Sequence, residues 1–286
     1  MPHETLVDVP TLVAHLRDPA WLVVDCRFQL ADPGAGERLH AEATIPGSIY
    51  AHLDRDLSRP IIPGRTGRHP LPAREVFAST LGRWGLSAST QVVAFDDMGG
   101  AFASRLWWML RWVGHRAAAV LDGGLPAWTA AGQRLEPGHH AAREPTSFTP
   151  GEALVETVDA DQVLALLDDP SVVLLDARAL PRFTGEEEST DPVAGHIAGA
   201  RSAPFMDNLG PSGRFLPADR LRARFVERLG GTEPDRAVAY CGSGVTACHD
   251  LLAMTHAGLP MARLYSGSWS DWINDPSRPW TAGPET

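Results

Sequence analysis

An internal repeat is the feature that most constrains how this chain can fold, because repeated blocks indicate repeated structural units. Short blocks of the first half return in the same order in the second half, 144 to 152 residues later. The four pairs are LVVDCR (22–27) with LLDAR (174–178), IPGS (45–48) with IAGA (197–200), VVAF (92–95) with AVAY (237–240), and LDGGLPAW (121–128) with YSGSWSDW (265–272). A single core seldom grows much beyond ~250 residues, so the 286 residues of the chain indicate two copies of one domain.

Each copy alternates short apolar runs with longer amphipathic stretches. The apolar runs are rich in Val and Leu, and they predict buried strands at 21–25, 91–95, 117–124, 171–176, 236–240 and 262–267. The amphipathic stretches predict helices at 73–84, 104–113, 158–167, 219–229 and 246–257. This alternation predicts the α/β class, with a mainly parallel sheet covered by helices on both faces in each domain.

The segment between the two copies has a different composition. Residues 132–151 (GQRLEPGHHAAREPTSFTPG) are polar, contain proline and lack apolar periodicity, which is typical of a linker. We therefore predict a first domain over residues 1–135, a linker over 136–156 and a second domain over 157–286.

Composition excludes several classes of function. The formal net charge of -10 argues against a nucleic-acid surface, which requires a basic patch. No apolar run approaches the roughly 20 residues that cross a bilayer, so we expect no membrane partner. The amino terminus shows no secretory signal, and we expect a cytoplasmic location. The three cysteines, Cys26, Cys241 and Cys248, form no Cys-x-x-Cys pair and no zinc-type spacing, so we expect reduced thiols and no metal.

Cys241 stands where chemistry is expected in an α/β fold. It follows the predicted strand 236–240 and precedes the loop Gly242-Ser243-Gly244-Val245-Thr246 and a predicted helix, and ligands in such folds bind beyond the carboxyl ends of strands. The two glycines let backbone N–H groups converge on one point, and the helix adds its positive end. A free thiol is only roughly 3 % thiolate at neutral pH, whereas a helix amino terminus favours the anion. Taken alone, a cysteine is more often a small buried apolar residue, but this context favours a nucleophile.

The corresponding position of the first copy holds Asp96 instead of a cysteine. A carboxylate there cannot act as a soft nucleophile and would repel an anionic donor, so we predict that the first domain is catalytically inactive. For Asp96 and Asp97 we expect the simpler role of capping the helix that begins near Phe102.

With these residues in view, nearly the whole chain resembles the tandem-domain rhodanese family of thiosulfate and 3-mercaptopyruvate sulfurtransferases. The resemblance rests on four motifs in the order and spacing of that family. These are DAR with RFTG (176–178 and 182–185), GHIAGA (195–200), the Cys241 loop and GSWSDW (267–272). It implies two tandem rhodanese-like domains, the second of them catalytic, and no cofactor.

The resemblance also implies roles for single residues. Ser243 would form a proton relay with His69 and Asp54 of the first domain, and Arg182 would hold the carboxylate of the donor. The loop residues Gly242, Gly244, Val245 and Thr246 would bind the substrate. Without the resemblance, His69 is expected on a surface loop and Arg182 in an ordinary solvated or ion-paired state. Cys26 and Cys248 are expected in the core, and Arg178 in a structural role.

The identity of the donor depends on two features of the sequence. The uncharged loop after Cys241 resembles the 3-mercaptopyruvate type, because thiosulfate enzymes commonly place charged residues there. Mammalian 3-mercaptopyruvate enzymes carry a second arginine shortly before the Gly-His-Ile motif, where this chain has GEEESTDP (185–192). We expect 3-mercaptopyruvate as donor, with thiosulfate as the alternative.

The expected reaction has two steps. Cys241 takes a sulfur atom from a small anionic donor as a persulfide and passes it to a thiol such as reduced thioredoxin, or to cyanide in an assay. A cysteine phosphatase is disfavoured, because the arginine required six positions after the cysteine is Ala247 here. A non-catalytic persulfide carrier or scaffold remains the alternative from another class.

Overall fold

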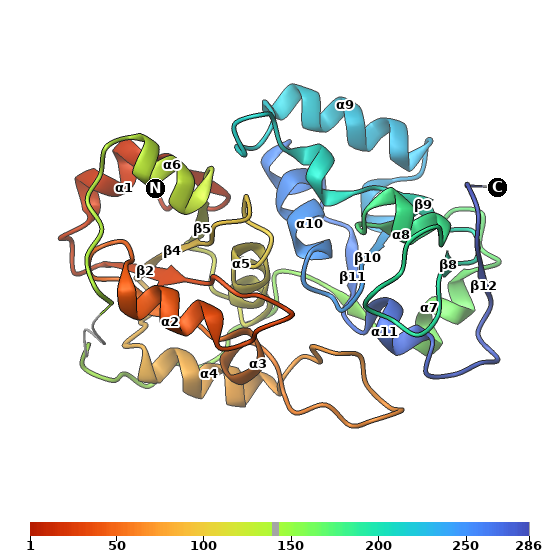
Figure 1. Ribbon diagram of the computed structural model, residues 1–286, viewed down its shortest axis with the longest axis horizontal. Coiled ribbons are helices and arrows are strands. Elements are labelled where there is room, and N and C mark those ends of the chain that lie inside the picture. Colours follow the sequence, from red (N-terminus) through yellow and green to blue (C-terminus); the bar gives the residue numbers. More distant parts are fainter. Residues whose placement is uncertain (139–142, 286) are drawn as a thin grey trace. The chain divides into compact units, whose positions relative to one another are not determined.

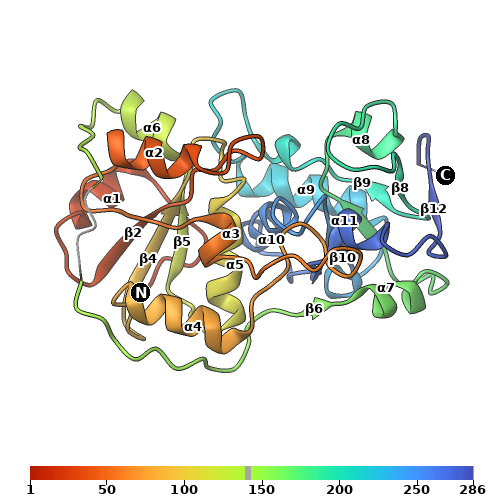
Figure 2. The same cartoon turned by 60° about the horizontal axis from the view of Figure 1, so that its bottom comes forward.

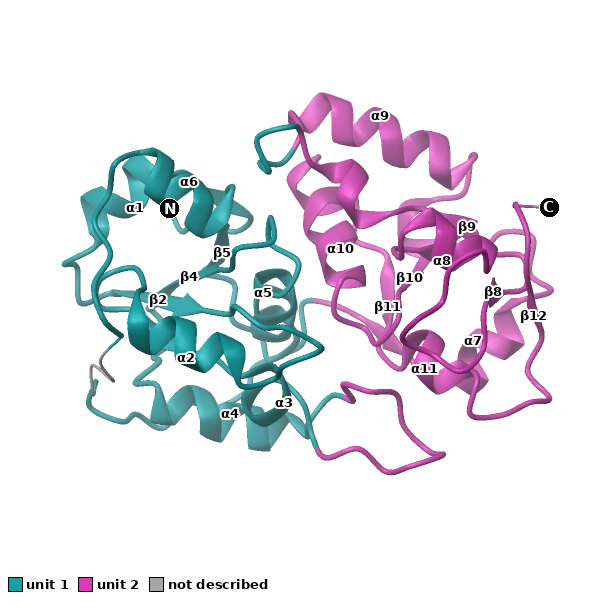
Figure 3. Ribbon diagram, viewed as in Figure 1, with its two compact units in different colours: residues 1–59, 71–154, 211–215 teal, residues 60–70, 155–210, 216–286 magenta. Residues whose placement is uncertain are grey.

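The computed structural model describes residues 1–138 and 143–285, and the chain forms two compact units (Figure 1, Figure 3). Unit 1 comprises residues 1–59, 71–154 and 211–215, and unit 2 comprises residues 60–70, 155–210 and 216–286. Residues 60–70 thus pack with the second unit although they lie in the first half of the sequence. The domain limits predicted from the sequence stay a prediction.

Unit 1 is built on a five-stranded parallel sheet of order β1-β5-β4-β2-β3. Its strands are β1 (Leu6–Val7), β2 (Trp21–Asp25), β3 (Ile49–Tyr50), β4 (Gln91–Phe95) and β5 (Ala118–Leu121). Its helices are α1 (Val9–His15), α2 (Ala35–Glu42), α3 (Leu53–Asp56), α4 (Arg74–Arg83), α5 (Ala103–Trp112) and α6 (Gly124–Ala130). Helices α1 and α6 pack on one face of the sheet through a shared apolar cluster, and α4 and α5 lie on the other face (Figure 2).

Unit 2 repeats this arrangement in a sheet of order β6-β11-β10-β7-β9, again parallel. Its strands are β6 (Thr157–Val158), β7 (Leu174–Asp176), β9 (Arg201–Ser202), β10 (Val238–Tyr240) and β11 (Arg263–Tyr265), beside an antiparallel pair of β8 (His196–Ile197) and β12 (Trp280–Thr281). Its helices are α7 (Ala160–Leu166), α8 (Leu180–Thr184), α9 (Ala218–Leu229), α10 (Ala247–His256) and α11 (Ser268–Trp272), with 3₁₀ turns at Phe205–Asn208 and Pro234–Arg236. The identical strand order confirms two α/β domains of one design.

The expected elements are present, and the differences lie at their ends. Val158 belongs to strand β6 and not to the predicted helix 158–167, because Asp159 and Gln162 form a capping box that starts α7 at Ala160. Strand β5 ends at Leu121, since Gly123 turns the chain with φ 78° and Gly124 begins α6. The two-residue strands at the sheet edges carry too little pattern to be predicted.

Part of the predicted linker can be followed on the structure. Its residues 139–142 lie outside the described residues. Beyond them the chain packs along unit 1, where Thr146 N donates to Gly82 O at 2.9 Å and Gly151 N donates to Val113 O at 2.9 Å. Within residues 1–138 and 143–285, none of the helices combines the length and the apolar character needed to cross a bilayer.

Candidate active site

The loop after β10 holds the Cys241 sulfur against backbone donors. Gly244 N donates to Cys241 Sγ at 3.2 Å, and the Cys241 side chain is 1 % exposed. Gly244 adopts φ 74°, and a Cβ added to it would lie 2.2 Å from the carbonyl oxygen of Ser266. Only glycine fits there without a shift of the backbone, so this position of the Cys241 loop requires glycine for a steric reason.

The start of α11 fixes the loop from the other side. Trp269 N donates to the Cys241 carbonyl at 2.9 Å, and Ser270 N donates to the Gly242 carbonyl at 3.0 Å. The hydroxyl of Ser268 accepts the Cys241 N–H at 3.1 Å, donates to Tyr265 O at 2.9 Å and lies 4.0 Å from Cys241 Sγ. Ser268 reaches this position with φ 58°, and among the described non-glycine residues it alone has positive φ. Such strain commonly persists at functional sites.

Ser243 and His69 form the buried pair that the resemblance implied. Ser243 Oγ and His69 Nδ1 lie 2.8 Å apart in a hydrogen bond, with exposed fractions of 6 % and 5 % for the two residues. The plain surface-loop role for His69 is therefore wrong, because residues 60–70 pack within unit 2, where Arg68 N donates to Ser270 Oγ at 3.1 Å. Asp54 lies in α3 of unit 1, and its part in a relay with His69 stays a prediction.

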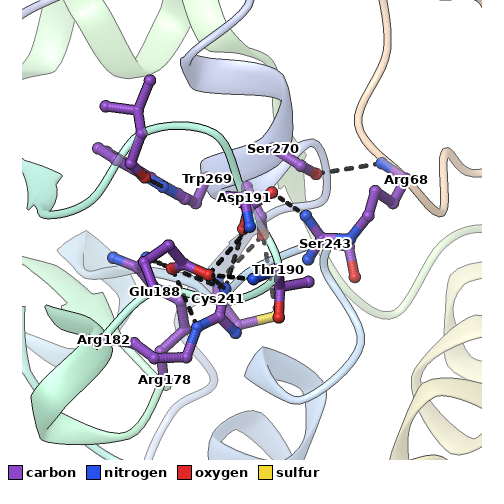
Figure 4. A network of polar contacts seen from close by, with 12 residues as sticks. Arg68, Arg178, Arg182, Glu188, Thr190, Asp191, Cys241, Ser243, Trp269 and Ser270 are labelled. Atoms are coloured by element: carbon purple, nitrogen blue, oxygen red, sulfur yellow. Dashed lines mark hydrogen bonds and ion pairs between the residues drawn. The ribbon is translucent and has the colours of Figure 1, made fainter. Parts of the chain in front are cut away.

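Two arginines bring positive charge to the Cys241 loop (Figure 4). A Cβ built on Gly242 would lie 2.8 Å from Arg68 Nη2 and 3.5 Å from Arg182 Nη1. These nitrogens face the loop, whereas the other nitrogens bind carboxylates: Arg68 Nη1 pairs with Asp191, and Arg182 Nε and Nη2 bind Glu188 at 3.0 Å. Sequence reasoning chose Arg182 and missed Arg68. The only available signal was its place beside His69.

Two carboxylates hold these arginines, since Glu188 binds Arg182 and Asp191 binds both. Asp191 bridges them, because it also accepts from Arg182 Nη2 at 2.9 Å. Both carboxylate side chains are 3 % exposed, against 26 % for Arg68 and 24 % for Arg182. Burial raises the pKa of Asp191 despite the two guanidinium groups. Burial acts in the same direction on Glu188, but the amides of Asp191 and Thr190 and the Arg182 guanidinium outweigh it and hold that pKa below its ordinary value.

The predicted part of Val245 and Thr246 in substrate binding stays a prediction, and both residues, like Arg178, make hydrogen bonds within unit 2. Val245 and Thr246 lead into α10, and their carbonyls accept from the amides of Cys248 and His249 at 3.1 Å. Arg178 makes a fork of hydrogen bonds to Asp176 at 2.6 to 3.0 Å and lies 4.8 Å from the Trp269 ring. This arginine therefore braces the domain.

The other cysteines lie in the core. Cys248 is buried in α10 and its Sγ donates to Gly244 O at 3.4 Å. Cys26 is buried at the end of β2, and burial raises the pKa of its thiol well above the ordinary range. The burial of both residues agrees with their expected place in the core. Across residues 1–138 and 143–285, no three His, Cys, Asp or Glu side chains gather in a way that could hold a metal ion.

In unit 1, Asp96 stands at the position that Cys241 has in unit 2. Its carboxylate accepts four backbone N–H groups, from Met98, Gly100, Phe102 and Ala103, at 2.8 to 2.9 Å. The predicted capping role of Asp96 is confirmed, because it binds the amides of Phe102 and Ala103 at the start of α5, and that of Asp97 stays a prediction.

Comparisons with known proteins agree with this geometry. The rhodanese-like domain family matches residues 8–131 and 159–275. A Pseudomonas aeruginosa protein named "Probable 3-mercaptopyruvate sulfurtransferase" is 52 % identical over 279 residues, covering 97 % of this chain and 98 % of its own. The thiosulfate sulfurtransferase of Bos taurus is 32 % identical over 283 residues, covering 94 % and 88 %.

Among solved structures, the 3-mercaptopyruvate sulfurtransferase from Leishmania major is similar with a TM-score of 0.83 and 31 % identity. The match covers 94 % of this chain and 74 % of that chain. A family match over both halves and relatives of this identity along almost the full length leave one conclusion. The chain belongs to the rhodanese family and carries two rhodanese-like domains.

Proposed function

We propose that this chain is a sulfurtransferase in which Cys241 carries sulfur as a persulfide and 3-mercaptopyruvate is the donor. The observation that carries the proposal is the cradle of Cys241, whose sulfur receives the Gly244 N–H at 3.2 Å at the end of a strand and the start of a helix. Backbone donors fixed in this way favour an anion, either the thiolate or the persulfide. Membership in the rhodanese family supports the reaction class. Relatives named 3-mercaptopyruvate sulfurtransferase and thiosulfate sulfurtransferase support it as well.

In the first step the Cys241 thiolate attacks the sulfur of the donor. A sulfur–sulfur bond forms and the carbon–sulfur bond of the donor breaks, so the electron pair leaves with carbon as the enolate of pyruvate. Protonation of that carbon gives pyruvate. Ser243 and His69, 2.8 Å apart and buried beside the loop, are suited to supply and shuttle this proton. Asp54 is assigned to the far end of the same relay.

The donor carboxylate is assigned to the arginines. Arg182 offers Nη1 and Arg68 offers Nη2 toward the Gly242 side of the loop, and a planar guanidinium suits a carboxylate. Residues 242–246 carry no charge of their own, so the loop is better matched to a monoanion than to dianionic thiosulfate. The 52 % identity to the Pseudomonas aeruginosa relative points to the same donor.

In the second step a thiolate attacks the outer sulfur of the persulfide and restores Cys241. We assign this step to a dithiol protein such as reduced thioredoxin, with cyanide as the assay acceptor. A reducing compartment, the cytoplasm, suits three buried cysteines that form no disulfide.

The test compares sulfur transfer to cyanide from 3-mercaptopyruvate and from thiosulfate on the unaltered protein, on Cys241→Ser and on Cys26→Ala. We expect 3-mercaptopyruvate to win by about tenfold or more in kcat/KM, Cys241→Ser to lose all turnover and Cys26→Ala to keep it. A thiosulfate preference would overturn the donor. Activity retained by Cys241→Ser would overturn the mechanism, and an unaltered protein that forms a persulfide without turnover would favour the carrier role.

A further inference from the structure

The acidic loop of residues 185–192 binds Arg68 and Arg182 beside Cys241. The transfer reaction itself does not require these carboxylates. Asp191 lies nine residues after Arg182 and 123 residues after Arg68 in sequence, yet its carboxylate binds both. One oxygen pairs with Arg68 and the other with Arg182, while Glu188 takes the remaining edge of Arg182. A carboxylate that joins two arginines beside a nucleophile controls the charge that a donor meets.

The formal charges of the two arginines and the two carboxylates that bind them sum to zero. Arg68 and Arg182 contribute two positive charges, and Glu188 and Asp191 contribute two negative charges within hydrogen-bond distance of them. The adjoining Arg178–Asp176 pair is neutral by itself. The nitrogens that face Gly242 therefore offer directional hydrogen bonds from a cluster with no net charge.

Burial makes this balance effective. The Asp191 and Glu188 side chains are almost completely covered, so water screens their charges weakly, whereas the Arg68 and Arg182 side chains remain about one quarter exposed. Charges that are shielded from solvent act over longer distances than surface charges. A donor at the loop would feel the two carboxylates together with the two guanidinium groups.

We infer that Asp191 is a specificity residue, which together with Glu188 neutralises Arg68 and Arg182 so that the site prefers a monoanionic donor over a dianionic one. The inference rests on the proposed function and deepens it. Asp191 acts through the arginines and does not itself contact the reacting sulfur. Repulsion by a fixed negative charge is twice as large for a dianion as for a monoanion at the same place, so the residue penalises thiosulfate more than 3-mercaptopyruvate.

The experiment measures kcat and KM for both donors in Asp191→Asn, Asp191→Glu and the control Glu187→Gln. Glu187 lies in the same loop and is exposed, so its variant makes the same formal charge change without touching the arginines. We expect Asp191→Asn to raise the ratio of kcat/KM for thiosulfate to that for 3-mercaptopyruvate by about tenfold, which corresponds to about 1.4 kcal/mol. Most of the change should fall in the KM for thiosulfate, and it should shrink as salt is added.

The controls separate charge from structure. Asp191→Glu and Glu187→Gln should keep the wild-type ratio within about threefold. An active Asp191→Asn with an unchanged ratio, or with equal losses for both donors, would overturn the inference and leave Asp191 a mere support for the arginines. If Asp191→Asn does not fold, Glu188→Gln removes the second carboxylate and should shift the ratio in the same direction.

A binding measurement keeps the outcome distinct from that of the proposed function. In the Cys241→Ser background, calorimetric titration with thiosulfate and with 3-mercaptopyruvate reports donor affinity without turnover. In this background too, Asp191→Asn should raise the affinity for thiosulfate relative to that for 3-mercaptopyruvate. Absence of turnover in the unaltered protein would defeat the proposed function, whereas an unchanged affinity ratio would defeat the role of Asp191.

Discussion

The loops after β4 and β10 share one backbone design and differ in what they hold. Each runs from a buried strand into a helix, with a glycine of positive φ three residues after the key side chain, Gly99 at 67° and Gly244 at 74°. In unit 1 the loop amides surround the Asp96 carboxylate, and in unit 2 the Gly244 amide points at the Cys241 sulfur. The unit 1 loop therefore surrounds a carboxylate with backbone donors, whereas the unit 2 loop presents the Gly244 N–H to a sulfur atom.

The two units also differ in the residue at the start of α6 and α11. Leu125 N donates to the Asp96 carbonyl at 2.8 Å, as Trp269 N does to the Cys241 carbonyl at 2.9 Å. The preceding residues, Gly124 and Ser268, have φ 55° and φ 58°. Unit 1 uses glycine where positive φ is free of cost, whereas unit 2 accepts strain for a hydroxyl that binds the Cys241 amide. The same scaffold is relaxed in one unit and strained in the other.

The largest expected effect comes from giving the unit 2 loop the residue of unit 1. Cys241→Asp should lose sulfur transfer by at least about 10⁴-fold, because a carboxylate cannot accept sulfur. The loop should still fold, since amides of the same arrangement solvate Asp96 in unit 1. Activity assays with both donors and denaturant unfolding check both statements. A loss of several kcal/mol, as for an unpaired buried charge, would show that the two cradles are not equivalent.

The helices that follow the two loops provide the next comparison, because α5 buries Arg105 where α10 buries Asp250. Burial, opposed by Arg224 and the Asn208 hydrogen bond, raises the pKa of Asp250 to about 7. A raised folded pKa gives stability that is fully present below the ordinary pKa and is lost as pH rises through 7. Relative to Asp250→Asn, the wild type should lose roughly 4 kcal/mol between pH 4 and pH 8.

Urea unfolding of both proteins across this range measures that difference. Asp219→Asn, which removes an exposed carboxyl of α9, should follow the wild-type profile. If the difference in free energy of unfolding between the wild type and Asp250→Asn is the same at all pH values from 4 to 8, the pKa of Asp250 is not raised.

The strands, the repeat and the place of Cys241 at the end of a strand could be predicted because they depend on local pattern. Val and Leu runs marked the central strands, and the glycines around Cys241 marked the cradle. The ion pairs of Asp191 could not be predicted, since Arg68 is 123 residues away and reaches it only because residues 60–70 pack with unit 2. The burial of His69 depends on the same packing, and local periodicity contains no information about it.

A moderate effect is expected from emptying the cradle of unit 1. Asp96→Ala leaves four backbone N–H groups, three of them in buried hydrogen bonds, without their acceptor, which should lower the free energy of unfolding by about 3 kcal/mol. Asp96→Asn retains one acceptor oxygen and should lose less. Denaturant titration measures both, and the activity per folded molecule should remain at the wild-type level because Cys241 belongs to the other loop. If Asp96→Ala leaves the free energy of unfolding unchanged, the cap of unit 1 adds nothing to the stability.

The smallest effect tests the exchange at the start of α11. Ser268→Gly gives unit 2 the residue of unit 1, so it relieves the positive φ, worth about 1 kcal/mol, and removes the acceptor of the Cys241 N–H, at a cost of about 1 kcal/mol. Stability should therefore stay within about 1 kcal/mol, while kcat/KM should fall about fivefold as the sulfur and its amide lose their positioning hydroxyl. Ser268→Ala keeps the strain and loses the hydroxyl, so it should show the same fall in rate together with a clear loss of stability. If the two variants have the same free energy of unfolding, the φ of 58° at residue 268 stores no strain. If both variants keep the wild-type kcat/KM, the Ser268 hydroxyl has no role in sulfur transfer.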